Sequence, residues 1–229
     1  MSGMLYLVPT PIGNLGDLSD RIRETLSEAD FIAAEDTRVS LKLLNHLGLK
    51  KPLVSYFEHN RAESGPRIVQ RLLAGETCAL VTDAGTPAIS DPGEDLVALC
   101  AQAGITVCAI PGPCAVITAL AVSGLPTGRF TFEGFLSTNK KSRRSCSRWL
   151  RGETRTMVFY EAPHKLCQTL ADLAECFGAD RRISLCRELS KLHEEILRMT
   201  LGEAITYYES QPPRGEYVLV LEGAKAPAE

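Results

Sequence analysis

The fold is decided by three stretches of sequence: LYLVPTPIGN (residues 5–14), VTDAGTPAISDPG (residues 81–93) and IPGPCAVITA (residues 110–119). In each, a short apolar run gives way abruptly to proline, glycine and small residues, which is typical of a buried strand followed by a rigid loop. In an open parallel sheet such loops all lie at one edge, where these folds bind ligands. The pattern predicts that backbone groups, rather than long side chains, face a small ligand.

The first half of the chain alternates between strand and helix patterns. Predicted strands are residues 4–8, 30–34, 52–56, 78–82 and 105–110. Leu18, Ile22 and Leu26 are spaced like one helix face, and further helices are predicted before Gly48, over 67–74, over 94–103 and over 114–122. Because crossovers between parallel strands are right-handed, this order predicts a parallel sheet with helices on both faces.

The second half has a different pattern. Strands are predicted over 130–135, 156–160, 182–187, 194–199 and 217–221, with helices over 164–177 and 203–209. The short gap before residue 194 allows a hairpin, so we expect a mixed sheet. The predicted organisation is therefore an α/β protein of two domains, residues 1–122 and 129–229, joined by a linker over 123–128.

Composition narrows the class of protein. The chain has 229 residues, 45% of them hydrophobic and 23% charged, as in an ordinary globular protein. No apolar run approaches the roughly 18–20 residues of a membrane span, and the N-terminus lacks the pattern of a signal peptide. The eight cysteines form no C-x-x-C pair, and the four histidines have no metal-ligand spacing. We therefore expect free thiols, a reducing cytoplasm, no membrane and no metal.

Charge is distributed unevenly along the chain. The net charge is −3, yet residues 137–155 contain seven basic residues and one acid, so that this stretch carries +6 and the remainder −9. Such a local basic segment suits a phosphate-rich partner, although a solvated helix face has the same composition. The residues in it that could bind such a partner are Lys140, Lys141, Arg143, Arg144 and Arg148.

Polar groups follow the second predicted strand. Glu35 and Asp36 are adjacent carboxylates at its end, with Arg38 close behind. One of the carboxylates could act as a general base, with Arg38 orienting it or holding a phosphate. The alternative is that Asp36 or Thr37 simply caps the next helix.

The loop over residues 83–93 is the densest candidate site. It lacks both the Gly-Lys-Ser/Thr ending of a phosphate-binding loop and the G-x-G-x-x-G pattern of dinucleotide-binding folds. Residues 111–115 lie at a strand-to-helix junction, which suits an anionic or polar ligand group but equally a plain proline cap.

Taken together and in this order, these loops resemble the tetrapyrrole methylase superfamily. Further matching stretches are AAEDTR (33–38), FTFEGFL (130–136), FYEAPH (159–164), CRELSK (186–191) and GEYVLVLEG (215–223). The match is closest to the branch that methylates small-subunit ribosomal RNA. The resemblance implies two α/β domains with S-adenosyl-L-methionine in the cleft between them, and a homodimer. It also implies 2′-O-methylation of a cytidine in the decoding centre of 16S rRNA, either free or in the assembled small subunit.

The resemblance also implies cofactor contacts at matching positions. These are Ile12 in the first loop, the second-loop residues Asp83, Ala84, Gly85, Thr86 and Ile89, the third-loop residues Cys114 and Ala115, and Glu161 and Arg187 in the second half. Members of this branch usually continue into a small C-terminal helical domain, whereas this chain ends at Glu229. We therefore expect either a truncated form or RNA anchoring by another element, such as the basic segment.

Two other functions remain open on the sequence alone. One is a sister activity of the superfamily, methylation of a tetrapyrrole or of a modified histidine in a translation factor. The other is a catalytically silent RNA-binding module that kept the fold. The basic segment favours RNA over a tetrapyrrole, and binding of S-adenosyl-L-methionine would distinguish an enzyme from a silent module.

Overall fold

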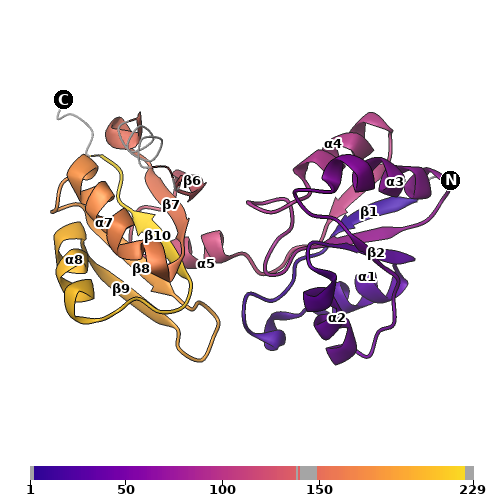
Figure 1. Cartoon of the computed structure of the whole chain (residues 1–229), viewed down its shortest axis with the longest axis horizontal. Helices are drawn as coiled ribbons and strands as arrows, with labels where there is room; N and C mark the ends of the chain where they lie inside the picture. The colour runs from indigo at the N-terminus through magenta and orange to yellow at the C-terminus, as the bar shows by residue number, and fades with distance from the viewer. Residues whose placement is uncertain (1–2, 138, 140–148, 225–229) are drawn as a thin grey trace. The chain divides into compact units, whose positions relative to one another are not determined.

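A computed structural model describes residues 3–137, 139 and 149–224. The chain forms two compact units, Met1–Cys114 and Ala115–Glu229 (Figure 1). Within the described residues, no helix is both long and apolar enough to cross a membrane. The seven cysteines in this part of the chain are all free thiols, and Cys78, Cys100 and Cys186 are buried.

The first unit contains a five-stranded parallel sheet in the order β3-β2-β4-β1-β5. Its strands are β1 (Met4–Leu7), β2 (Phe31–Ala34), β3 (Leu53–Ser55), β4 (Cys78–Val81) and β5 (Thr106–Ala109). Helices α1 (Asp20–Glu28) and α2 (Thr37–His46) cover one face, and α3 (Arg61–Leu73) and α4 (Glu94–Gln102) cover the other (Figure 1). A short 3-10 helix, η1 (Leu15–Asp17), precedes α1. The predicted doubly covered parallel sheet is confirmed.

Two hydrophobic cores, one on each face, hold this sheet between its helices. Successive side chains of β2 point to opposite faces, so Phe31 packs in the core with Leu72 and Leu96, while Ile32 packs in the core with Ile22. All four residues of β2, and all four of β4, are buried. A strand buried on both faces is a continuous apolar run, which is why these strands were visible in the sequence.

Helix α3 begins at Arg61, six residues before the predicted start at 67. The prediction rested on the apolar spacing of residues 67–74 alone. The structure instead begins the helix after Asn60, whose side chain accepts a hydrogen bond from the Phe57 amide (2.8 Å) and donates to the Ser55 carbonyl (3.0 Å). This side chain fixes the preceding turn, and the helix then accommodates Pro66 inside it.

The second unit contains a mixed five-stranded sheet in the order β6-β7-β10-β8-β9. Its strands are β6 (Phe130–Phe135), β7 (Thr156–Glu161), β8 (Arg182–Arg187), β9 (Glu195–Thr200) and β10 (Tyr217–Leu221). Only β6 and β7 pair in parallel, and β8 and β9 form the predicted hairpin. Helices α7 (Pro163–Phe177) and α8 (Leu201–Ser210) pack on one face, and a 3-10 helix, η2 (Leu150–Gly152), precedes β7. The predicted mixed sheet is confirmed.

Helix α5 (Ala115–Val122) groups with the second unit, whereas the sequence placed residues 115–122 in the first domain. It packs on β10 and β7. The carbonyl of Val122 accepts a hydrogen bond from Arg198 of β9 at 2.5 Å, and the Ala119 carbonyl accepts one from the buried Cys186 thiol. These long-range contacts leave no sign in the local pattern of small apolar residues.

Candidate functional site

The three loops predicted to bind a ligand are joined to one another at the carboxyl edge of the first sheet. Thr10 and Gly85 form an antiparallel bridge, with N–H···O distances of 2.9 and 3.0 Å. The buried Thr10 hydroxyl also donates to the Thr82 carbonyl at 3.0 Å. The Thr86 hydroxyl donates to the Pro113 carbonyl at 2.9 Å, which ties the second loop to the third. The edge therefore presents one continuous surface of backbone and small side chains.

The second loop is held in an unusual backbone conformation. Gly85 has φ +89°, and the non-glycine residues Ala88 and Ser90 have φ of 67° and 65°. Left-handed non-glycine residues cost on the order of 1–3 kcal/mol each and persist where the surrounding structure fixes them. Such strain clusters at functional sites, which supports the interpretation of this loop as part of one.

Carboxylates connect the ends of β2 and β4. Glu35 accepts hydrogen bonds from the Thr82 hydroxyl at 2.6 Å and from the Asp83 amide at 3.4 Å. The Asp83 carboxylate in turn accepts one from the Asp36 amide at 3.1 Å. The predicted candidates Glu35, Asp36 and Asp83 thus lie together, although Asp83 is far in sequence from the other two.

Asp36 and Arg38 are engaged with each other. Asp36 is the N-cap of α2, where its side chain accepts from the Arg38 amide at 2.8 Å, and it forms an ion pair with the Arg38 guanidinium at 2.6 Å. Hydrogen bonds from Arg38 lower the pKa of Asp36 to about 2. A carboxylate with so low a pKa is a weak proton acceptor near neutral pH, so the capping alternative describes the local geometry of Asp36.

Asp91 is a candidate that sequence reasoning missed. Burial, followed by the charge of Glu35, raises the pKa of Asp91 to about 6, against the effect of a hydrogen bond from Thr82. Burial and Glu35 also raise the pKa of Asp83. Perturbed carboxyl groups of this kind mark candidate functional sites. The only sequence signal was that Asp91 lies between Ser90 and Pro92 in the dense loop.

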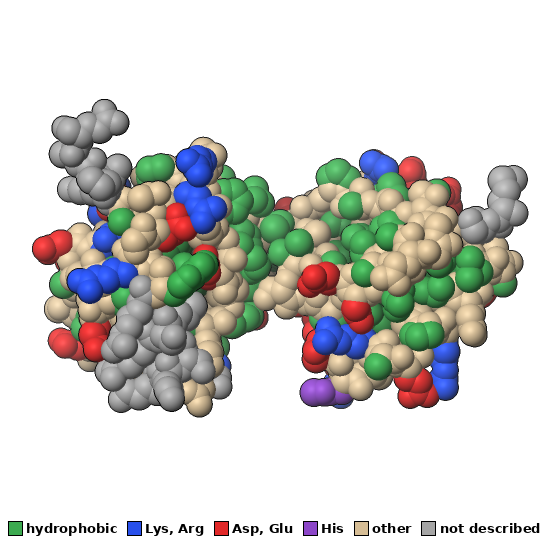
Figure 2. Space-filling view, turned by 90° about the horizontal axis from the view of Figure 1, so that it is seen from above, with side chains coloured by type: hydrophobic (Ala, Val, Ile, Leu, Met, Phe, Trp, Pro, Cys, Tyr) green, Lys and Arg blue, Asp and Glu red, His purple; other side chains and the backbone are tan. Residues whose placement is uncertain are grey.

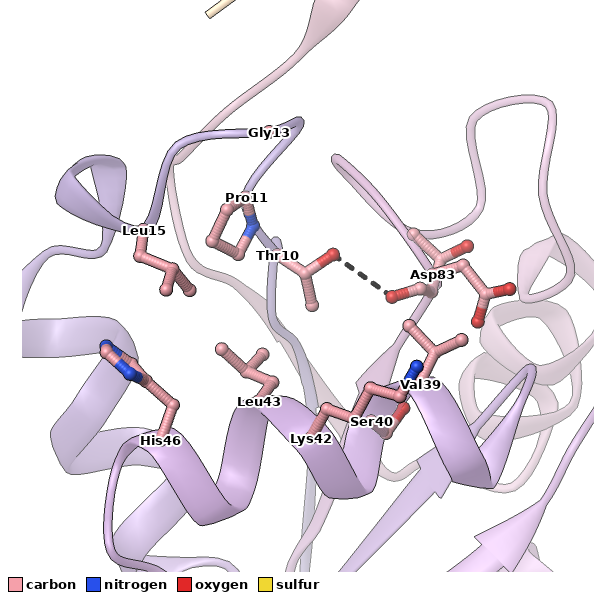
Figure 3. A pocket seen from close by; sticks show the side chains of 11 residues that line it. Thr10, Pro11, Gly13, Leu15, Val39, Ser40, Lys42, Leu43, His46 and Asp83 are labelled. Carbon is pink, nitrogen blue, oxygen red and sulfur yellow. Dashed lines mark hydrogen bonds between the residues drawn. The ribbon is translucent and has the colours of Figure 1, made fainter. Parts of the chain in front are cut away.

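Two hollows lie at this edge of the sheet. One, of about 280 Å³, lies between the first loop and α2, and it extends to Thr82 and Asp83 (Figure 3). The other, of about 550 Å³, lies at the ends of β2, β3 and β4. Residues lining this second hollow include Glu35, Phe57, His59, Arg61 and Asp91. Asp83 lines the first hollow, and Glu35 and Asp91 line the second. The hydrogen bond from the Asp83 amide to Glu35 links the two sets of residues.

The remaining predicted cofactor residues lie in both units. Ile12, Ala84 and Ile89 are on the first and second loops, and Cys114 and Ala115 precede and begin α5. Glu161 and Arg187 sit at the same end of the second sheet, each in register with Tyr217.

Both of these side chains have partners in their own unit. The buried Glu161 carboxylate accepts from the Thr169 hydroxyl at 2.5 Å and from the Ala162 amide at 2.8 Å. Arg187 donates to the His193 carbonyl at 3.3 Å and lies 3.4 Å from the Glu195 carboxylate. Their roles toward a cofactor stay predictions.

The predicted RNA-binding residues Lys140, Lys141, Arg143, Arg144 and Arg148 lie outside the described residues. Within the segment, Arg155 is described and pairs with Glu153 at 2.6 Å. On the face shown in Figure 2, charges of both signs are interspersed with hydrophobic side chains over the described part of each unit. Among described residues, no group of three or more histidine, cysteine or acidic side chains is arranged to hold a metal ion.

Comparison with known proteins agrees with the resemblance seen in the sequence. The family model of tetrapyrrole (corrin/porphyrin) methylases matches residues 4–205. The ribosomal RNA small subunit methyltransferase I of Synechocystis sp. is 51% identical over 222 residues, 97% of this chain and 80% of that protein. The protein of the same name from Halalkalibacterium halodurans is 51% identical over 221 residues, 96% of this chain and 76% of that protein.

Among solved structures, uroporphyrin-III-C-methyltransferase from Thermus thermophilus has the same fold. Its TM-score is 0.66 at 20% sequence identity, covering 96% of this chain and 94% of that one. The family predicted from the sequence is thereby confirmed. The chain belongs to the tetrapyrrole (corrin/porphyrin) methylase family, and it is a methyltransferase.

Proposed function

We propose that this protein transfers a methyl group from S-adenosyl-L-methionine to the ribose 2′-oxygen of a cytidine in the decoding centre of 16S rRNA. The observation that carries the proposal is that hydrogen bonds join the three loops into one surface at the carboxyl edge of the first sheet. The chain is also 51% identical to two small-subunit rRNA methyltransferases. The substrate is 16S rRNA or the assembled small subunit, and a second copy of the chain is the expected partner. The distant likeness to the uroporphyrin enzyme supports the fold alone.

The loop residues fit such a cofactor. Asp83, Ala84 and Ile89 are exposed on the second loop, whereas Gly85 is buried, and a Cβ there would contact Ile12 at 3.4 Å and the Pro113 carbonyl at 3.8 Å. The Thr86 hydroxyl is already bonded to that carbonyl and holds the surface in place. When bound, S-adenosyl-L-methionine supplies a methyl group already activated on a sulfonium centre. The loops need only hold and orient the reactants, which contributes on the order of 7–11 kcal/mol.

We assign the proton-accepting role to Asp91, with Glu35 and Thr82 as its positioning residues. Asp91 would take the proton of the ribose hydroxyl as the methyl group passed from the sulfonium sulfur to the ribose oxygen, and the broken carbon–sulfur bond would leave a neutral thioether. A pKa of about 6 leaves Asp91 ionised at neutral pH yet more basic than an ordinary aspartate. A general base contributes about 10²- to 10⁴-fold, less than orientation does. Arg38, 86% exposed and paired with Asp36, can meet a phosphate from the solvent side.

The test is methylation of purified small subunits, and separately of free 16S rRNA, with labelled S-adenosyl-L-methionine, followed by mapping of the modified nucleotide. We expect one 2′-O-methylcytidine in the decoding centre. Calorimetric titration with the cofactor is run in parallel. Absence of binding at millimolar cofactor would indicate a silent RNA-binding module, whereas cofactor binding with methylation only of a tetrapyrrole would indicate the sister activity.

A further inference from the structure

The smaller hollow, between the first loop and α2, has walls suited to a flat apolar group (Figure 3). Pro11 and Leu15 approach from the loop, and Val39 and Leu43 face them from the helix. Leu15 is 46% exposed and Val39 36% exposed, so large apolar side chains stand open to solvent here. At about 280 Å³ the hollow is just below the roughly 300–1,000 Å³ of drug-sized ligand pockets, which favours a single ring system.

A buried hydroxyl in this hollow lacks a partner. Ser40 lines the hollow and is 5% exposed, and its Oγ makes no hydrogen bond within the part of the chain that the structure describes. Leaving a buried polar group unpaired is unfavourable, so such groups usually indicate a missing water or ligand. A ligand with a polar edge would satisfy Ser40 while its faces contact the apolar walls.

The polar side chains at the rim indicate which kind of ligand the hollow would bind. Lys42 and His46 are exposed, line the hollow and lie four residues apart on one face of α2. Figure 3 shows His46 at one end of the hollow and Asp83 at the other. A flat apolar group with a polar edge and an attached anion, bound away from Asp83, has the chemistry of a nucleotide in a single strand.

We infer that this hollow binds an unpaired nucleobase of the rRNA strand, adjacent to the methylated nucleotide, with Lys42 and His46 on its phosphate. The inference rests on the proposed function. Sequence-specific RNA recognition commonly takes unstacked bases into pockets and reads their edges by hydrogen bonds. The hollow reaches Thr82 and Asp83, and Thr82 also bonds Glu35, so the bound base lies next to the carboxylates proposed for catalysis.

Filling the hollow tests this inference. Val39→Trp places a large side chain in the hollow from an exposed position of α2. Leu41→Trp is the control: it adds the same side chain to α2 at a residue that is 49% exposed and does not line the hollow. A base held in a pocket is worth about 10- to 100-fold in affinity. We therefore expect Val39→Trp to raise KM for small subunits about 10-fold or more, with cofactor affinity unchanged and Leu41→Trp near wild type.

A second variant removes the two polar rim side chains, Lys42 and His46, without altering the apolar walls. Lys42→Ala/His46→Ala should raise KM and make the slope of affinity against salt shallower by about 1 for each phosphate that is no longer neutralised. Lys50→Ala, an exposed lysine outside the hollow, is its control. Ultraviolet cross-linking of the complex should map to peptides containing residues 11–15 or 39–46.

Three outcomes are separated by this design. Equal KM for Val39→Trp and Leu41→Trp, in active enzymes that bind cofactor normally, overturns the inference and leaves the proposed function intact. Cross-links found only outside residues 11–15 and 39–46 do the same. A wild-type protein that methylates no RNA refutes the proposed function, and the inference with it.

Discussion

Replacing Asp91 by asparagine should slow methyl transfer and stabilise the fold at the same time. Burial and the charge of Glu35 raise the pKa of this carboxyl to about 6 from its ordinary value of 3.8. That difference corresponds to a free-energy penalty of about 3 kcal/mol on the ionised form. Because the side chain is only partly buried, solvent screening reduces the penalty to about 1–1.5 kcal/mol, and the uncharged asparagine avoids it.

The pH dependence of this stabilisation has a definite sign. Below about pH 4 the wild-type carboxyl is protonated in both the folded and the unfolded chain, so this group gives the variant no advantage. As the pH rises toward about 6, the unfolded chain releases its proton first and wild-type folding becomes less favourable. Above that pH the advantage of Asp91→Asn is complete, and a gain of about 1 kcal/mol raises Tm by about 2–4 °C in a chain of this length.

The assay combines initial methylation rates with thermal unfolding, each measured from pH 5 to pH 8. Loss of the general base should lower kcat about 10²- to 10⁴-fold. The wild-type rate should fall about tenfold per pH unit below pH 6, and this dependence should disappear in the variant. Glu58→Gln is the control, because Glu58 lines the same hollow as Asp91 but is 60% exposed. Among the described residues it forms an ion pair only with Arg61. An unchanged kcat, or a lower Tm at pH 8, would refute the reasoning.

Substitutions at three further positions test the loops and the second unit. Gly85→Ala introduces a side chain at φ +89°, which should cost about 1–2 kcal/mol of stability and weaken cofactor binding measured by calorimetry, although space for the Cβ exists. Glu161→Ala leaves the buried Thr169 hydroxyl and a backbone amide unpaired, so urea unfolding should show a loss of about 1–3 kcal/mol, and Glu161→Gln a smaller one. Leu219→Ala, in the fully buried core of the second sheet, should cost about 2–5 kcal/mol in the same experiment.

The sequence predicted the fold well where local pattern and tertiary environment agree. β2 and β4 are buried on both faces and therefore appear as unbroken apolar runs. The start of α3 was wrong because the first turns carry no apolar spacing, and the Asn60 side chain fixes the turn before the helix. The place of α5 was wrong because its partners, among them Arg198, are distant in sequence.

For the candidate site too, the sequence predicted the features that depend on local residues and missed those set by distant ones. Proline and glycine spacing predicted the three loops, since that chemistry is local. The distinction between Asp36 and Asp91 was hidden, because both are aspartates beside loop residues. Arg38, two positions away, makes Asp36 a cap with a low pKa. Glu35, far away in sequence, helps to raise the pKa of Asp91. A pKa set by tertiary neighbours leaves no mark on the residue that carries it.

The arrangement of charge at the sheet edge constrains how an RNA strand would lie on it. Glu35, Asp83 and Asp91 form a negative region that repels a phosphodiester, and only the ribose hydroxyl gains from lying against it. Lys42 and His46 line the smaller hollow, with His46 at the end opposite Asp83. A strand with its phosphates at the rim of that hollow and one ribose at the carboxylates avoids charge repulsion. A strand with its phosphates at the carboxylates would be repelled there. Charge therefore favours one placement of the phosphates, away from the carboxylates, before any base is read.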